Sequence, residues 1–214
     1  VTAFIGQEAM HGREHEDYNS ALFARNPIAL KFESFVLGVF GLMKKHLPAS
    51  YSLSATIALE HFTALLADSV LQISEFFDGA EEHYANIWRW HAFEETEHKA
   101  VAYDVWNTAM GQGIYAYLLR SFGLVAATIV FWGFVLPVFT KIVIDEKKLT
   151  DLPSWKKAYK YTFGEVGALR RQLGNYIDYF RPNYHPWDHD NREKMMALQD
   201  LIYQLADATA AKQK

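Results

Sequence analysis

The chain has 214 residues and a mass of 24.6 kDa, and half of its residues are hydrophobic, which suffices for one sizeable domain with a core. Its net charge of −4 gives no electrostatic case for binding nucleic acid. Because cysteine is absent, disulfides, thiolate zinc sites and cysteine nucleophiles are excluded, and any metal must be held by His, Asp and Glu.

Apolar residues recur at helical spacing along the chain, and no segment shows the alternation typical of a strand. Pro27 and Pro48 bound the second predicted helix, and Gly79 and Gly111 follow the third and the fourth. The sequence therefore predicts an all-α protein with a single helical domain. The predicted helices cover residues 1–24, 27–47, 52–77, 80–110, 114–144, 154–180 and 191–211.

Composition divides this domain (residues 1–214) into three parts. They are bundle helices over 1–110, a very apolar helix or hairpin over 114–144, and additional C-terminal helices over 152–212. Residues 121–140 carry no charge, which meets the length criterion for a membrane span. The alternative is a central helix that is buried inside a large bundle and kinked at Pro137.

The first residues have neither a basic stretch nor an uninterrupted apolar run, so they do not resemble a signal peptide. We therefore expect a cytoplasmic location, with association with the inner membrane as the alternative that the apolar segment raises. The sequence also begins inside a predicted helix without a capping residue. We expect a further helix upstream of Val1.

A carboxylate and an imidazole three residues apart occur twice, as Glu8 with His11 and as Glu95 with His98. On a helix this spacing places both side chains on one face, about one turn apart. Two such helices, with single glutamates from two more, form the ligand set of di-iron and di-manganese carboxylate bundles. The repeated pattern therefore predicts a dinuclear metal site.

Three further residues extend the pattern. His15 and His91 fall near the same helical faces as the two pairs, and Glu60 lies among apolar and small residues. Burying such a carboxylate is costly unless it is paired or bound to a metal. A remaining glutamate would come from the upstream helix, or His15 or His91 would complete the coordination. The predicted metal ligands are Glu8, His11, Glu60, Glu95, His98, His91 and His15.

Three stretches also carry a resemblance to a known family. The first is residues 4–11 with His15 and Asn19. The second is Trp90-His91 together with Glu94-Glu95, Glu97-His98-Lys99 and Asp104. The third is the closing residues 182–187. They resemble the bacterial predicted metal-dependent hydrolases over nearly the whole chain. The resemblance implies a ferritin-like helical bundle, a metal-dependent hydrolase activity and an additional N-terminal portion with a further Glu.

The ligand pattern predicts a dinuclear metal enzyme with two divalent ions, iron first, with manganese or zinc as alternatives. Iron would support an O₂-dependent oxidoreductase, which is the first prediction by analogy with other such bundles. Zinc or manganese would instead activate a water molecule for hydrolysis, as the family resemblance implies. The third alternative is a non-enzymatic, membrane-associated helical protein whose Glu and His side chains only form hydrogen bonds.

The aromatic-rich helices and the apolar segment predict a small apolar substrate. No dinucleotide fingerprint or phosphate-binding loop occurs, so an oxidative reaction would need a separate reductase as partner.

Overall fold

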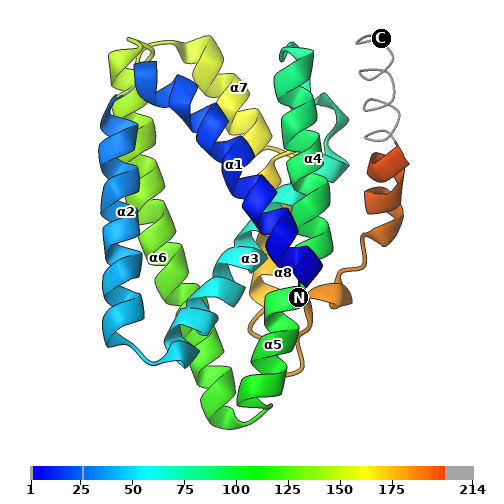
Figure 1. The fold of residues 1–214 in the computed structure, drawn as a ribbon. Coiled ribbons are helices and arrows are strands. Elements are labelled where there is room, and N and C mark those ends of the chain that lie inside the picture. Colours follow the sequence, from blue (N-terminus) through cyan, green and yellow to red (C-terminus); the bar gives the residue numbers. More distant parts are fainter. Residues whose placement is uncertain (1, 26, 201–214) are drawn as a thin grey trace, which may run out of the picture.

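The computed structural model describes residues 2–25 and 27–200, and every regular element in this part of the chain is helical, which confirms the all-α class (Figure 1). The part of the last predicted helix beyond residue 200 lies outside the described residues, whereas residues 192–200 are helical. The other elements are α1 (Thr2–Arg25), α2 (Pro27–His46), α3 (Ala49–Gln72), η1 (Ser74–Phe77), α4 (Glu82–His98), α5 (Val101–Met110), α6 (Ile114–Asp145), α7 (Leu152–Thr162), α8 (Ala168–Asp178) and η2 (Pro186–Asp188).

The central element is α3, which packs against α4, α5, α6 and α8. Along one edge α2 and α6 run side by side, and α1 crosses the molecule obliquely from the start of α2 towards the junction of α4 and α5 (Figure 1). Pro27 begins α2, as predicted, because a proline at the first helical position lacks only an N–H that would have no helical partner. This path brings the first turns of α1 to α4.

Two predicted helices are each divided in the structure. The segment 80–110 breaks at Lys99 and Ala100, where the buried Lys99 side chain donates to the backbone oxygen of His189 and to Oδ1 of Asn191, both at 2.8 Å. The segment 154–180 breaks between α7 and α8. There a Cβ atom on Gly167 would lie 2.6 Å from the backbone of α7, so the tight return of the chain requires a glycine.

A buried arginine fastens the C-terminal segment to α6. The Arg120 guanidinium donates to the backbone oxygens of Tyr179 (2.5 Å) and Arg181 (2.8 Å), and it lies over the ring of Tyr179. Tyr103 of α5 donates to the backbone oxygen of Tyr184 at 2.7 Å. Charge-assisted hydrogen bonds of this kind hold the turn after α8 against the core.

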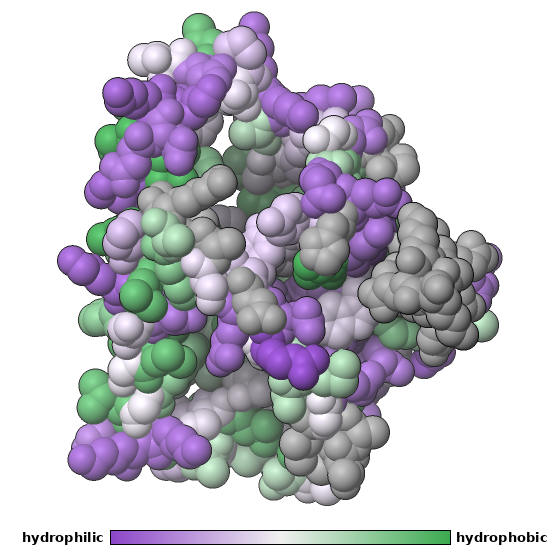
Figure 2. Space-filling view, turned by 45° about the horizontal axis from the view of Figure 1, so that its top comes forward, coloured by the Kyte–Doolittle hydropathy of each residue, from purple (hydrophilic) through white to green (hydrophobic). Residues whose placement is uncertain are grey.

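The apolar segment forms one continuous helix, α6, which passes through Pro137 without a break and is therefore not a hairpin. By length and composition this helix is able to cross a membrane, but such a helix alone is weak support for a span. Only 11% of its most apolar 18-residue window is buried, so the described residues do not cover it on all sides. Apolar side chains of α2, such as Phe35 and Leu37, are also exposed. Figure 2 shows hydrophobic residues among hydrophilic ones along the left side of the surface. Membrane association stays a prediction.

Candidate metal site

The crossing of α1 over α4 brings the two predicted Glu and His pairs together. Oε1 of Glu8 lies 2.9 Å from Nδ1 of His98, so each helix contributes one member to this contact. Nε2 of His98 lies 3.2 Å from Oε1 of Gln7, whose amide nitrogen in turn donates to Glu97 at 3.0 Å. Each ring nitrogen of His98 therefore has an oxygen acceptor within reach, the Glu8 carboxylate at Nδ1 and the Gln7 amide at Nε2. We call Glu8 and His98 the first donor group.

A second donor group lies next to the first. Its residues follow Glu8 on α1 and precede His98 on α4. It consists of His11 from α1 with His91, Glu94 and Glu95 from α4. Nδ1 of His11 lies 3.2 Å from Oε2 of Glu94 and 3.8 Å from Oε1 of Glu95, and Nε2 of His91 lies 3.8 Å from the same Glu95 oxygen. The carboxylates of Glu94 and Glu95 are buried, so two acidic groups and two imidazoles share a space with little access to solvent.

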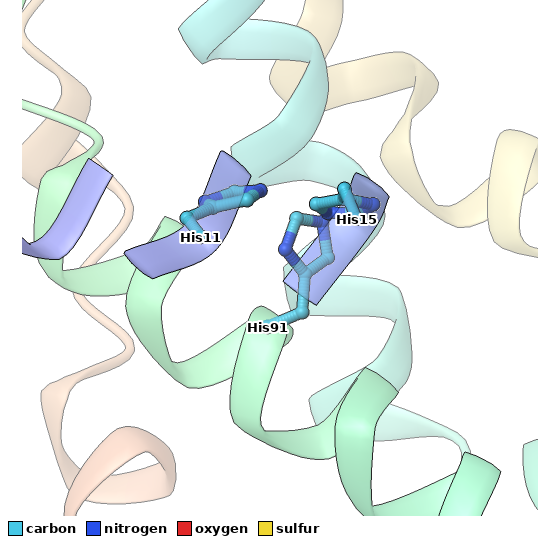
Figure 3. A group of neighbouring side chains, drawn as sticks. All are labelled: His11, His15 and His91. Carbon is cyan, nitrogen blue, oxygen red and sulfur yellow. The ribbon is translucent and has the colours of Figure 1, made fainter. Parts of the chain in front are cut away.

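His15 adds a third imidazole to this region (Figure 3). One nitrogen from each of His11, His15 and His91 lies within 4.8 Å of the others. The rings of His11 and His15 are stacked, with centroids 4.6 Å apart, and the ring of His91 meets both of them edge-on. Three imidazoles gathered in this way are a frequent beginning of a transition-metal site.

Glu60 of α3 interacts electrostatically with both donor groups: with Glu8 of the first, and with Glu95 and His11 of the second. Burial, followed by the negative charges of Glu95 and Glu8, raises the pKa of its carboxyl to about 7. Burial likewise raises the pKa of Glu95, although a hydrogen bond from Thr63 opposes the rise. The carboxylates therefore hold more negative charge than this environment favours, which is the condition that a bound cation relieves.

The histidines differ in their affinity for protons. Burial, followed by the neighbouring His11 and His15, lowers the pKa of His91 to about 3, and burial followed by His11 lowers the pKa of His15. The contact with Glu94 raises the pKa of His11. His91 is therefore neutral at physiological pH, and a neutral imidazole is the form that binds metal ions.

The distances in the second donor group fit a shared cation. Metal–nitrogen and metal–oxygen bonds of about 2.1 Å place two donors on one ion about 3.0 Å apart at a right angle and at most about 4.2 Å apart. The separations of 3.2 and 3.8 Å lie inside that limit. Moreover, Nδ1 of His11 and Oε2 of Glu94 are buried and close, and they form an ion pair when His11 is protonated. A cation would compete with this proton for the same two atoms.

All seven predicted ligands therefore come from α1, α3 and α4 and lie in this region, while their role as ligands stays a prediction. Sequence reasoning did not select Glu94, Thr63 or Gln7. The available signal for Glu94 was its position next to Glu95, within one turn of His91 and His98. Gln7 and Thr63 carried no comparable signal, because their partners belong to other helices.

Comparison with known proteins gives one match. The family model described as predicted metal-dependent hydrolase matches residues 1–190. The chain belongs to this family. Neither a curated protein nor a solved structure matches the chain significantly. The resemblance seen in the sequence is thus confirmed, and the family supports a metal-dependent enzyme. Its description favours hydrolysis, which the ligand pattern alone placed second, and gives no support to a di-iron oxidoreductase.

Proposed function

We propose that this protein is a metal-dependent hydrolase that uses two divalent ions, zinc or manganese, to cleave an ester. One observation carries the proposal: two groups of donor atoms from α1 and α4 lie next to each other, and the Glu60 carboxylate of α3 is coupled electrostatically to both. The first donor group and the second would each hold one ion, and Glu60 would lie between them. The family description supports hydrolysis as the reaction.

The protein side chains would hold the ions and fix their surroundings. Glu8 and His98 would bind the first ion, with Gln7 accepting the outer proton of His98 and keeping its ring in place. His11 and Glu95 would bind the second ion with His91. Thr63, whose hydroxyl donates to the backbone oxygen of Glu60 at 3.1 Å, lies beside Glu95 and would limit the positions of that carboxylate.

Bound divalent ions supply Lewis-acid polarisation and a water molecule of lowered pKa. In the overall reaction the water oxygen bonds to the carbonyl carbon and the bond from that carbon to the alcohol oxygen breaks. One water proton passes to the alcohol, and the other is released from the carboxylic acid product to solvent. The buried position of Glu94 and Glu95 keeps this region poor in bulk water, which strengthens its electrostatic interactions.

A second candidate is the di-iron O₂-dependent oxidoreductase. The observation that favours it is the pairing of one Glu and one His from each of two crossing helices, as in di-iron bundles. That reading would require iron and a separate reductase. It ranks second here because the family description names a hydrolase.

Metal analysis tests the site itself. Purified protein should contain about two metal ions per chain, and the double variant Glu95→Ala, His98→Ala should lose most of them. The matched control is Glu16→Ala, His46→Ala, which removes the same residue types from exposed positions and should keep the metal. Equal metal content in the two double variants would reject a metal site on α4, and absence of metal from the wild type would favour a non-enzymatic helical protein.

A reaction under nitrogen separates the two enzyme candidates. Hydrolysis of 4-nitrophenyl acetate by protein loaded with zinc or manganese should proceed without oxygen and should stop in the Glu95→Ala, His98→Ala variant. An iron-loaded protein that develops colour with O₂ and leaves esters intact would instead support the oxidoreductase.

A further inference from the structure

A cavity of about 320 Å³ lies beside the candidate metal site, between α3, α4 and η1. Its volume falls near the lower end of the range of about 300–1,000 Å³ that small-molecule sites occupy. We name it the acyl cavity and define it by the residues Thr63, Leu66, Val70, Phe76, Trp88 and His91. None of the predicted ligands except His91 lines it, so it adjoins the donor groups without being part of them.

Thr63, Ser69 and His91 bring polar side chains to the acyl cavity. Two of them adjoin the second donor group: Nε2 of His91 lies 3.8 Å from Oε1 of Glu95, and Thr63 lies close enough to the same carboxyl to lower its pKa. The Ser69 hydroxyl donates to the backbone oxygen of Leu65 and is therefore satisfied within α3. In addition, Nδ1 of His91 is buried without a hydrogen-bond partner. A ligand in the cavity would therefore meet the candidate metal site with one end and apolar walls with the rest.

The walls indicate the chemical class of that ligand. Among the described residues that line the cavity there is no Asp, Glu, Lys or Arg, and the rings of Phe76 and Trp88 stand with Leu66 and Val70 around the remaining space. A sugar or a phosphorylated group would lose its hydrogen bonds to water there without replacement. An alkyl chain loses nothing of this kind and gains from leaving water.

We propose that the acyl cavity binds the uncharged apolar chain of a carboxylic ester and places the ester group at the end formed by His91 and Thr63. This inference rests on the proposed hydrolase function for its reaction, but the binding of the chain has a readout of its own. Each methylene group that enters the cavity should improve kcat/KM about fourfold, until the cavity is full.

The first experiment follows chain length. The metal-loaded wild type is assayed with 4-nitrophenyl acetate, butyrate, hexanoate and octanoate, and binding of the free carboxylic acids of the same lengths is measured by calorimetry. Both kcat/KM and acid affinity should rise from acetate to hexanoate. Affinity and kcat/KM that do not change with length would overturn the proposal, although hydrolysis itself would then still stand.

Matched variants locate the chain. Val70→Phe reduces the acyl cavity, and Val36→Phe makes the same change in a separate apolar cavity of about 350 Å³ between α2, α3 and α6. Val70→Phe should abolish the gain with chain length, whereas Val36→Phe should keep both that gain and the wild-type rate with acetate. The opposite pattern would place the chain between α2 and α6 and overturn the proposal.

Two further results keep the test decisive. If Val70→Phe fails to fold, Leu66→Trp fills the cavity from a partly exposed position instead. The dependence of kcat/KM and acid affinity on chain length in the wild type tests the proposal without any variant. If no ester is cleaved but acid affinity rises with length and is lost in Val70→Phe, the acyl cavity is retained and the hydrolase function is rejected.

Discussion

Glu60 gives a prediction in which stability and metal binding oppose each other. In the metal-free protein, burial and the charges of Glu95 and Glu8 raise the pKa of the Glu60 carboxyl from 4.5 to about 7. Below pH 4.5 the group is protonated in both the folded and the unfolded chain, and it has no effect on the free energy of unfolding. As the pH rises towards 7, the unfolded chain ionises first, so the folded state loses stability.

The size of this effect follows from the two pKa values. At about 1.4 kcal/mol for each pH unit, the rise from 4.5 to about 7 corresponds to a loss of about 3 kcal/mol once the group is fully ionised. Glu60→Gln keeps the shape of the side chain and cannot ionise. The metal-free variant should therefore be more stable than the metal-free wild type, by about 2.5 kcal/mol more near pH 8 than near pH 5.

Urea unfolding in the presence of a chelator measures this difference at both pH values, with Glu16→Gln on the exposed side of α1 as the control. Adding zinc or manganese near pH 8 should raise the unfolding midpoint of the wild type more than that of Glu60→Gln, because a cation compensates the ionised Glu60 carboxylate and the variant carries no such charge. If the stability difference between wild type and Glu60→Gln is the same at both pH values, the buried carboxyl is not strained and the electrostatic argument fails.

Three other predictions concern the frame and surface of the molecule. Arg120→Met should lower the free energy of unfolding by about 3 kcal/mol in urea, because two buried carbonyl oxygens lose a charged donor; a loss below about 1 kcal/mol would contradict this. Gly123→Ala should destabilise by about 1–3 kcal/mol, because the new methyl group would overlap Ser54 Oγ, and Ser54→Ala should partly rescue it in a double-mutant cycle; strict additivity would refute the contact. If α6 binds membranes, Ile129→Lys should reduce flotation with phospholipid vesicles, while Leu152→Lys on α7, with the same exposed fraction of 68%, should not; equal flotation of both variants would reject α6 as the contact.

The elements of the site that repeat along one helix were predictable from the sequence. The spacing of Glu8 and His11, and of Glu95 and His98, places each pair on one face regardless of the rest of the fold. The start of α2 at Pro27 was equally local, because it depends on the backbone of the proline itself. Such features need no knowledge of which helix lies opposite.

Features that depend on a distant partner were not predictable. At the break after α4, Lys99 contacts residues about ninety positions later in the chain. Helical periodicity alone does not reveal this contact, so it predicted one continuous helix. Glu94 lies about 100° around the helix from Glu95, which placed it off the predicted ligand face. It joins the second donor group because α1 crosses α4 obliquely and brings His11 to that side of the helix.

The crossing of α1 over α4 brings together buried carboxylates and neutral imidazoles, and the buried carboxylates are unfavourable for the stability of the fold. Glu60, Glu94 and Glu95 place acidic groups in or near the core without a lysine or arginine in direct contact in the described part of the chain, and His91 stays neutral beside them. Buried carboxylates with no opposite charge destabilise a fold, and a substitution that merely removed charge would relieve them. A divalent cation relieves them as well, and it uses the lone pairs of the neutral imidazoles at the same time. If a cation is the partner of these carboxylates, Glu60→Gln should raise the stability of the metal-free protein and weaken its metal binding.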